Sequence, residues 1–432
     1  MSHQLKRQVV FGLLIVALVW LFMPVEPAHA ASIVVNDLGG GSTPGQCSLR
    51  DAITAANTNT GINACSTGAP GPDTITFSVT GVITLTGSLG SVSEDLTIIG
   101  PSGGITITGN NTNFHSSLLT VMAPATVNLS NLAITNALKS GSAGAAITNF
   151  GTLVLDNVTL SNNTSTYAAA GISNAGTLLI SNSTFSENTC TGCNFGAIGS
   201  SGPITITNST FVNNSANEGG AIFQNPNTAG ISLMITNSTF SNNQAVNGNG
   251  GALNVNYGSL VAANSTFSGN TASGFGGGIY YNSPADPGTI TNVTFSGNSA
   301  GSGGAINMRA GADLTLKNTI VTASPSGGNC NTALTDGGNN LEYGNGVTST
   351  TCGFAAASAD PQLGALADNG GPTPTMKLLT GSPAINQGND AVCAAAPVNN
   401  QDQRGVTRPF GAHCDIGAFE AVMRLFLPLI QR

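Results

Sequence analysis

The chain has 432 residues, of which 7% are charged and 5% are aromatic, and its formal net charge is −8 at pH 7. An average soluble domain carries about 25% charged residues. The 11 Lys and Arg residues are too few for the basic surface with which a nucleic-acid-binding protein neutralises phosphates. Helix bundles and coiled coils are excluded because they are rich in Ala, Glu, Lys, Leu and Arg. The 40% apolar content combined with low charge argues against a disordered chain.

Residues 1–30 have the pattern of an export signal. Lys6 and Arg7 precede an apolar run of 15 residues, Val9 to Met23, and the segment ends in Ala28-His29-Ala30. A signal peptide has this order of basic, apolar and small-residue parts, whereas a membrane span needs about 20 apolar residues. We therefore expect cleavage after Ala30, a protein that is secreted or held at the cell surface, and no membrane span in the mature chain. An uncleaved anchor is the alternative.

Residues 31–120 are predicted to form an N-terminal cap and the first, irregular coils. Ser48 followed three residues later by Asp51 is a capping-box pattern, and the apolar residues after Ser48 fall on one face of a helix. This predicts a short helix within residues 47–57 that lies over the first coil. Alternating runs then predict strands at residues 73–77, 82–85, 96–99 and 105–107.

An internal repeat of about 26 residues fills residues 121–322. Its clearest mark is an Asn followed three residues later by an apolar residue, and successive marks are 25 to 29 residues apart. The marking residues are Asn131, Asn157, Asn182, Asn208, Asn237, Asn264, Asn292 and Asn318. In six repeats a second Asn follows the apolar residue by three positions, and these are Asn163, Asn188, Asn214, Asn243, Asn270 and Asn298. A Gly-Gly-Ala-Ile block recurs between the marks.

Each period holds several short strand-like pieces separated by Gly and Asn turns. A leucine-rich repeat would need its Leu pattern, and a propeller blade would need about 40 residues. The repeat therefore predicts an all-β fold, a single parallel β-helix of about ten coils whose equivalent positions stack about 4.8 Å apart. We expect Phe, Ile and Leu to stack in the core and the eight marking Asn residues to form a structural ladder of amide hydrogen bonds. The Asn-Ser-Thr triplets also match glycosylation acceptors, but their fixed place in each coil favours the ladder.

The eight cysteines fall into sequence-local pairs: Cys47 with Cys65, Cys190 with Cys193, Cys330 with Cys352, and Cys393 with Cys414. Disulfides are the default in an exported chain, although sequence alone does not fix their connectivity. The Cys190–Cys193 segment could instead be a redox motif or half of a zinc site. The mature chain has two histidines, His115 and His413, which leaves few partners for a metal ion.

The period breaks after about residue 322, and residues 323–420 are predicted to form an irregular, disulfide-containing C-terminal cap. Charge concentrates there at Asp402, Arg404, Arg408 and Asp415. Pairing between the arginines and nearby carboxylates accounts for these residues as part of the cap, and an anion or metal site is the alternative. Residues 421–432 form an apolar tail that is too short to span a membrane. It is either a frayed terminus or last strand, or a tag for sorting or surface retention.

Three segments resemble known bacterial families. Cys47-Ser-Leu-Arg-Asp-Ala-Ile53 is similar to the CSLREA-type segment of secreted β-helix proteins, and the Gly-Gly-Ala-Ile and Phe-Ser-x-Asn blocks resemble the repeats of polymorphic outer-membrane proteins. Residues 360–420 resemble the choice-of-anchor Q domain, through motifs such as Asp402-Gln-Arg-Gly and Cys414-Asp-Ile-Gly-Ala-Phe-Glu. The resemblance implies a right-handed coil and an exported, often surface-attached protein. These families carry no agreed catalytic residues, so none is transferred.

Polysaccharide cleavage on a β-helix would need grouped carboxylates, either as a pair for hydrolysis or as calcium ligands beside a base. The few charged residues of the repeat fall at different positions of the coil. We therefore expect an extracellular or cell-surface β-helix protein with a structural, adhesive or glycan-contacting role, and no catalytic residue, cofactor or metal. A polysaccharide or another surface protein would be its partner, and the chain would be a monomer. The alternative is a carbohydrate-active enzyme of the pectate-lyase-like kind, a polysaccharide lyase or hydrolase.

Overall fold

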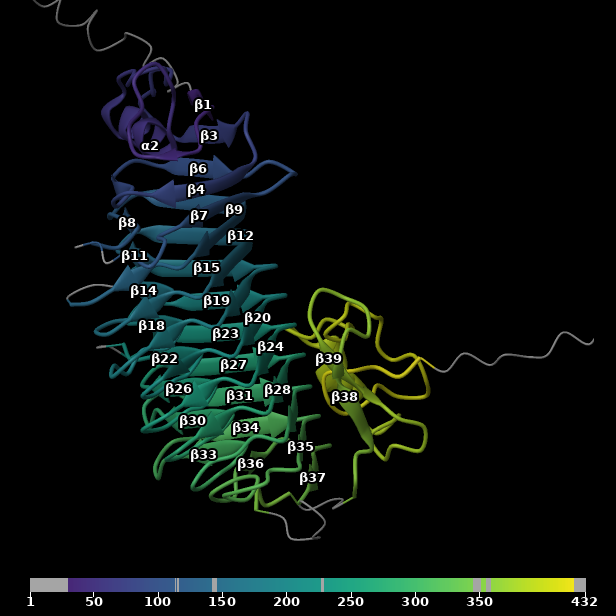
Figure 1. The fold of residues 1–432 in the computed structure, drawn as a ribbon. Helices are drawn as coiled ribbons and strands as arrows, with labels where there is room; N and C mark the ends of the chain where they lie inside the picture. The colour runs from purple at the N-terminus through teal and green to yellow at the C-terminus, as the bar shows by residue number, and fades with distance from the viewer. Residues whose placement is uncertain are drawn as a thin grey trace, which may run out of the picture.

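The computed structural model describes residues 30–422, apart from 113, 115, 142–145, 227–228, 345–350 and 355–358. The predicted signal peptide up to residue 29, His115 and the predicted tail from residue 423 lie outside the described residues. No helix in the described part of the chain is long and apolar enough to cross a membrane. Most of this part winds into a solenoid of short strands, with a helix at its N-terminal end (Figure 1).

Each regular turn of the solenoid contributes strands to three main columns, in which neighbouring strands pair in parallel. The first column consists of β1 (Ser32–Val35), β3 (Asp73–Phe77), β6 (Leu96–Ile99), β9 (Thr126–Thr135), β12 (Thr152–Ser161), β15 (Thr177–Ser181), β19 (Ile204–Thr207), β23 (Ser232–Thr236), β27 (Ser259–Ala263), β31 (Gly288–Thr291), β34 (Leu314–Lys317) and β36 (Thr335–Asp336). The second column consists of β2 (Gly39–Gly40), β4 (Gly81–Leu85), β7 (Ile105–Thr108), the second halves of β9 and β12, β16 (Thr184–Ser186), β20 (Thr210–Val212), β24 (Thr239–Ser241), β28 (Thr266–Ser268), β32 (Thr294–Ser296), β35 (Ile320–Thr322) and β37 (Leu341–Tyr343).

The third column consists of β5 (Gly90–Val92), β8 (Leu119–Val121), β11 (Ile147–Asn149), β14 (Ile172–Asn174), β18 (Ile198–Ser200), β22 (Ile222–Gln224), β26 (Leu253–Asn256), β30 (Ile279–Asn282) and β33 (Ile306–Met308). A minor fourth column consists of β10 (Leu138–Lys139), β13 (Thr164–Ser165), β17 (Thr189–Cys190), β21 (Ser215–Ala216), β25 (Gln244–Ala245) and β29 (Thr271–Ala272). The nine strands of the third column mark about nine turns. The predicted all-β parallel solenoid is confirmed, with a turn fewer than the ten expected.

One Phe from each of five successive coils stacks inside the second column. Phe185, Phe211, Phe240, Phe267 and Phe295 are all 0% exposed. Neighbouring ring centroids lie 4.6 to 4.9 Å apart, with interplanar angles of 4 to 16°. This spacing follows from the separation of paired strands, about 4.8 Å. The repeated Phe of the sequence is therefore a continuous core column.

The eight marking Asn residues turn the chain from the first column into the second. All eight have positive φ, between 44° and 57°, a conformation that Asn tolerates better than most residues. Their side chains form a ladder only in part. Asn157 donates to Asn131 at 2.9 Å and Asn208 donates to Asn182 at 3.3 Å, but Asn182 itself donates to the carboxylate of Asp156.

The continuous ladder is built by the second Asn of the repeat instead. Its members are 0% exposed, and each side-chain amide donates to the Oδ1 atom of the next at 2.8 to 2.9 Å. The members are Asn163, Asn188, Asn214, Asn243, Asn270 and Asn298. Each amide from Asn163 to Asn270 also donates to a carbonyl oxygen. This pairing matters because an unpaired buried polar group costs about 1–3 kcal/mol.

The Ser of the Asn-Ser-Thr triplet fills the corner of the coil. Ser183, Ser209, Ser238 and Ser265 are buried, and each hydroxyl donates to the carbonyl oxygen two residues earlier. The hydroxyls of the last three also accept the backbone N–H of the equivalent Ser in the preceding coil at 3.1 Å. The triplet thus supplies a left-handed turn, a buried acceptor and the first residue of a second-column strand.

The N-terminal end is closed by α2 (Leu49–Thr58), as predicted. The hydroxyl of Ser48 accepts the backbone N–H of Asp51 at 3.2 Å and donates to its carboxylate at 2.9 Å. Burial alone would raise the pKa of Asp51, but hydrogen bonds from Ser42, Asn63 and Ser48 outweigh it and lower that pKa below its usual value. The helix is held to the following loop by a disulfide between Cys47 and Cys65.

Residues 323–422 form two parts. The first completes the last turns with β36 and β37 and carries the disulfide between Cys330 and Cys352. Residues 359–422, here named the C-terminal lobe, contain the antiparallel pair β38 (Leu363–Ala367) and β39 (Thr375–Leu378) and the short helix α3 (Asp390–Ala394). The lobe lies beside the second column rather than over the end of the solenoid (Figure 1).

The predicted irregular, disulfide-containing region after residue 322 is present, and its larger part, the lobe, lies beside the solenoid rather than across its end. Ile320 and Leu341 take the outward position that Thr occupies in the preceding coils. They pack in one apolar cluster with Ile416 and Phe419 of the lobe. These two apolar side chains thus hold the lobe at the outer face, because its contact removes their apolar surface from water.

All four disulfides join the cysteines in the sequence-local pairs, including Cys190 with Cys193 and Cys393 with Cys414. No cysteine is free. A zinc site at Cys190 and Cys193 would need thiolates, which the disulfide between them removes.

Candidate functional site

The charged residues singled out in the sequence, Asp402, Arg404, Arg408 and Asp415, lie in the core of the lobe. The side chains of Asp402 and Arg408 are 0% exposed. Asp402 accepts Arg404 at 2.6 Å and also three backbone N–H groups, those of Arg404, Val406 and Glu420. Arg408 donates to the carbonyl oxygens of Asp415 and Gly417 at 2.9 and 2.8 Å. These groups bind the loops of the lobe to one another.

Burial shifts the pKa values of three of these buried side chains. It raises the pKa of Asp415 and Glu420, and backbone N–H donors to each carboxylate only partly offset it. It also lowers the pKa of Arg408, against the attraction of Glu420, Asp402 and Asp415. Because the carboxylates already accept donors of the lobe itself, the arrangement supports pairing within the fold rather than an anion or metal site. Within the described ranges no group of three or more His, Cys, Asp or Glu side chains could hold a metal ion.

The lobe is held to the solenoid through the outward Thr column of the second column. Thr239 donates to the carbonyl oxygen of Pro374 at 2.6 Å, and Thr266 donates to the side chain of Gln403 at 2.7 Å. The backbone N–H of Ala418 donates to Thr294 at 3.0 Å. Equivalent residues in earlier coils, such as Thr184 and Thr210, stay half-buried and uncovered by the lobe.

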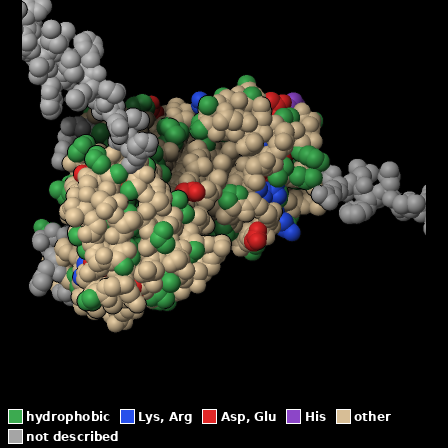
Figure 2. All heavy atoms as spheres, turned by 90° about the horizontal axis from the view of Figure 1, so that it is seen from above, with side chains coloured by type: hydrophobic (Ala, Val, Ile, Leu, Met, Phe, Trp, Pro, Cys, Tyr) green, Lys and Arg blue, Asp and Glu red, His purple; other side chains and the backbone are tan. Residues whose placement is uncertain are grey.

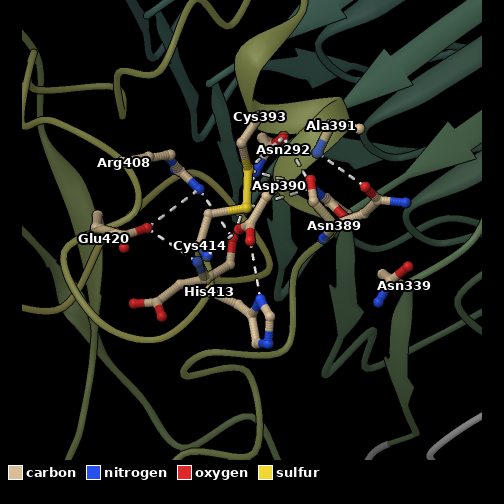
Figure 3. The surroundings of a disulfide bond; sticks show 12 residues. Asn292, Asn339, Asn389, Asp390, Ala391, Cys393, Arg408, His413, Cys414 and Glu420 are labelled. Carbon is tan, nitrogen blue, oxygen red and sulfur yellow. Dashed lines mark hydrogen bonds and ion pairs between the residues drawn. A yellow bond between two sulfur atoms is a disulfide. The ribbon is translucent and has the colours of Figure 1, made fainter.

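The marking Asn residues of the last coils bind the lobe near the disulfide between Cys393 and Cys414 (Figure 3). Asn292 donates to the carbonyl oxygen of Asp415 at 3.3 Å. Asn318 accepts the backbone N–H of Asn389 at 2.9 Å and donates to its carbonyl oxygen at 3.2 Å. In the last coils the repeated Asn therefore also binds the lobe, since its side-chain amide can both donate to and accept from a backbone peptide group.

A polar recess of about 420 Å³ opens between the lobe and the last coil, and Asn339, Asn389 and His413 are among its lining residues. His413 lies 2.8 Å from the carboxylate of Asp390 (Figure 3), and the two side chains are 61% and 44% exposed. The hydrogen bond with His413 lowers the pKa of Asp390. This pair has the orientation of a base and its supporting carboxylate, but the residues that line the recess include no hydroxyl or thiol nucleophile.

The outer face of the third column differs from the rest of the solenoid. The residue after the Ile or Leu of each Gly-Gly-Ala-Ile block lies on the side of the strand that faces away from the core, and register places these residues in one line, here named the outer row. Neighbouring loops cover part of this row, since Phe223, Asn254 and Asn307 are buried. The outer row consists of Thr148, Ser173, Gly199, Phe223, Asn254, Tyr280 and Asn307. Its aromatic residues each contact another aromatic side chain from a neighbouring loop. Phe195 meets Phe223 edge to face at 5.2 Å, and Phe275 stacks near Tyr280 at 6.3 Å.

Charge is sparse on this molecule, and Figure 2 shows one face made mainly of uncharged side chains and backbone. The outer row has one acidic neighbour, Glu218, whose carboxylate accepts the side chain of Asn254 at 2.9 Å. Burial raises the pKa of Glu218, and the bond from Asn254 offsets this only in part. Other carboxylates of the solenoid are engaged elsewhere. Asp156 accepts Ser181 and Asn182, and Asp286 accepts the backbone N–H groups of Gly230 and Gly258.

The outer row and its aromatic neighbours were not predicted from the sequence. The sequence did contain a sign of this surface. The residue after the Ile or Leu of successive repeats is Thr, Ser, Gly, Phe, Asn, Tyr and Asn. The preceding position is Ile or Leu in every repeat, whereas this one varies in size and polarity. A variable outward position in an otherwise regular repeat is typical of a binding surface.

No protein-family profile and no curated protein sequence matches this chain. Among solved structures, the fold is similar to that of the pectate lyase Pel9A, with a TM-score of 0.53 and 15% sequence identity over 91% of this chain and 97% of that one. A similarity at this identity concerns the fold alone. The chain is therefore a parallel β-helix with the fold seen in a pectate lyase.

Proposed function

We propose that this is an exported β-helix protein, secreted or held at the cell surface, that binds glycans along the outer row without cleaving them. The observation that carries the proposal is a group of accessible aromatic side chains along the outer row, in a chain with only 5% aromatic residues. These side chains are Phe150, Phe195, Phe275 and Tyr280, and the amide of Asn225 lies beside the first two. Aromatic faces pack against the C–H groups of a sugar ring, and amides bind its hydroxyls. Four disulfides support a location outside the cytosol.

The solenoid geometry suits a polymeric ligand. Residues of the outer row follow one another at the strand spacing of about 4.8 Å, so a chain of sugars can contact several coils at once. The similar fold of a pectate lyase supports a polysaccharide as the class of ligand. Another surface protein that carries such glycans would satisfy the same contacts.

The test uses the mature chain, residues 31–432, with a panel of neutral and acidic polysaccharides. Depletion of the protein onto a polymer and release of new sugar ends are both measured, with and without calcium. We expect depletion onto at least one polymer and no release of ends. Tyr280→Ala should weaken the depletion, whereas Phe410→Ala, which removes an exposed Phe from the lobe, should leave it unchanged. Binding to none of the polymers would contradict the proposal.

A carbohydrate-active enzyme is the second candidate, and Glu218 favours it. A carboxyl group whose pKa burial raises can act as a general acid at a glycosidic bond. Glu218 also acts electrostatically on Tyr280, as does Arg309, so three ionisable groups adjoin the outer row. A hydrolase would need a second carboxylate at the bond. Release of sugar ends that Glu218→Gln abolishes, with binding retained, would establish this candidate instead.

A further inference from the structure

The outer row contains a hollow of about 380 Å³ over β11, β14 and β18. Its floor is formed by small outward residues, Thr148, Ser173 and Gly199, which pair in register. One wall carries Phe150, which is 50% exposed, and the other carries Phe195. Ligand pockets span about 300–1,000 Å³, so the hollow has the size of a ligand site.

Gly199 leaves room for one aromatic wall of this hollow. A side chain there would meet carbons of Phe195 at 2.7 to 2.8 Å, so the ring of Phe195 lies directly over the glycine. The next residue of the outer row, Phe223, holds that ring from the side in an edge-to-face contact at an angle of 87°. The aromatic wall is therefore fixed before any ligand arrives, which reduces the entropy lost on binding.

Polar groups are available along the rim. The hydroxyls of Ser173 and Ser201 and the side-chain amide of Asn225 line the hollow, and no described residue forms a hydrogen bond to these side chains. The residues that line the hollow include no Asp, Glu, Lys, Arg or His. An ionic ligand would lose its hydration there without gaining a counter-charge.

We infer that this hollow is a subsite for one or two uncharged sugar rings of a neutral glycan, held between Phe150 and Phe195. The inference rests on the proposed function and adds to it a place and a ligand class. Apolar C–H faces of the sugar meet the two aromatic walls, while its hydroxyls meet Ser173, Ser201 and Asn225. Arg309 belongs to a later coil, so a counter-charge for an acidic segment of a glycan lies there rather than in the hollow.

The test is calorimetric titration of the mature chain with cellohexaose, mannohexaose and xylohexaose as neutral probes, hexagalacturonate as an acidic probe and indole as an apolar probe. Phe150→Ala and Phe195→Ala should each weaken binding of a neutral hexasaccharide by about tenfold or more. Gly199→Ala should do the same by pushing Phe195 into the hollow. Phe410→Ala is the matched control, because Phe410 is also 50% exposed and lies on the lobe.

The outcomes separate this inference from the proposed function. If glycans bind but Phe150→Ala, which alters an exposed side chain and spares the core, leaves the affinity unchanged, the subsite is wrong and the proposed function stands. If only the binding of hexagalacturonate or of indole depends on Phe150 and Phe195, the inferred class of ligand is wrong. If the wild-type chain binds no glycan on any face, the proposed function fails and the subsite fails with it. Equal thermal midpoints for the variants and the wild type show that each comparison concerns binding.

Discussion

The side-chain amide of Gln403 donates to the hydroxyl of Thr239 at 2.8 Å, across 164 positions of sequence. The same amide also donates to Thr373 at 2.8 Å, and its oxygen accepts Thr266. One buried Gln thus joins two coils of the solenoid to two segments of the lobe. The lobe is therefore packed against the solenoid, where hydrogen bonds between uncharged groups and the apolar cluster around Ile320 hold it.

Replacing this residue should loosen the lobe. Gln403→Leu keeps the volume but removes the donor to Thr239 and Thr373 and the acceptor of Thr266. The hydroxyl of Thr266 is then left unpaired, at a cost on the order of 1–3 kcal/mol. We expect faster release of the lobe by limited proteolysis, with the solenoid intact. Gln401→Leu is the control, because its side chain is exposed two residues away. Equal cleavage of the two variants would show that Gln403 does not hold the lobe.

The Phe stack should dominate the stability of the middle coils. Phe240→Ala removes a fully buried ring between two stacked neighbours, and such truncations cost about 3–5 kcal/mol. The denaturant midpoint should fall accordingly. Phe410→Ala, at an exposed position, should change the free energy of unfolding by less than about 0.5 kcal/mol. A Phe240→Ala variant as stable as the wild type would contradict the stack as a core element.

The two Asn columns should respond differently to substitution. Asn214→Ala interrupts the buried ladder, because it removes the side-chain acceptor of Asn188 and the side-chain donor to Asn243, so we expect a loss of about 1–3 kcal/mol. Asn182→Gly keeps the positive φ of the corner and should be close to neutral. Urea titration of both variants measures the difference. Equal losses would mean that the corner amides also carry stability.

Acid should weaken the N-terminal cap through Asp51. Its pKa is lower in the fold than its usual value of 3.8, so its contribution to stability is fully present above that value. The contribution is lost as the pH falls through the folded pKa. The difference in unfolding midpoint between the wild type and Asp51→Asn should therefore be largest near neutral pH and shrink below about pH 4. A constant difference down to pH 2 would show that the charge of Asp51 is not involved.

Much of the solenoid could be predicted because it is a local repeat. Equivalent residues recur every 25 to 29 positions, so the corner Asn, the core Phe and the strand runs appear directly in the sequence. The capping helix was predictable because its signal is also local. Ser48 and Asp51, which form the cap, are three residues apart. Which Asn forms the ladder depends on which side chain points inward at the turn, and both columns fit the same sequence pattern.

The lobe and the outer row were harder to predict for physical reasons. Contacts such as Gln403 with Thr266 join residues far apart in sequence, and no periodicity reports them. Gly417 packs so closely that a side chain there would meet Ile320 at 2.7 Å, which only the fold reveals. Ile320 and Leu341 did carry a signal, because apolar residues replace Thr at an outward position. The charged residues of the lobe are apparent in the sequence, but their burial is not.

The central claim is that a glycan lies on the outer row and is left intact. Hydrogen–deuterium exchange of the mature chain, with and without the polysaccharide that depletes it best, tests this most directly. We expect slower exchange in the loops and turns that flank β14, β18 and β22 and unchanged exchange in the lobe. The chain length of the polymer should be the same before and after the experiment. Protection confined to the lobe or to the second column, or a shortened polymer, would contradict this claim.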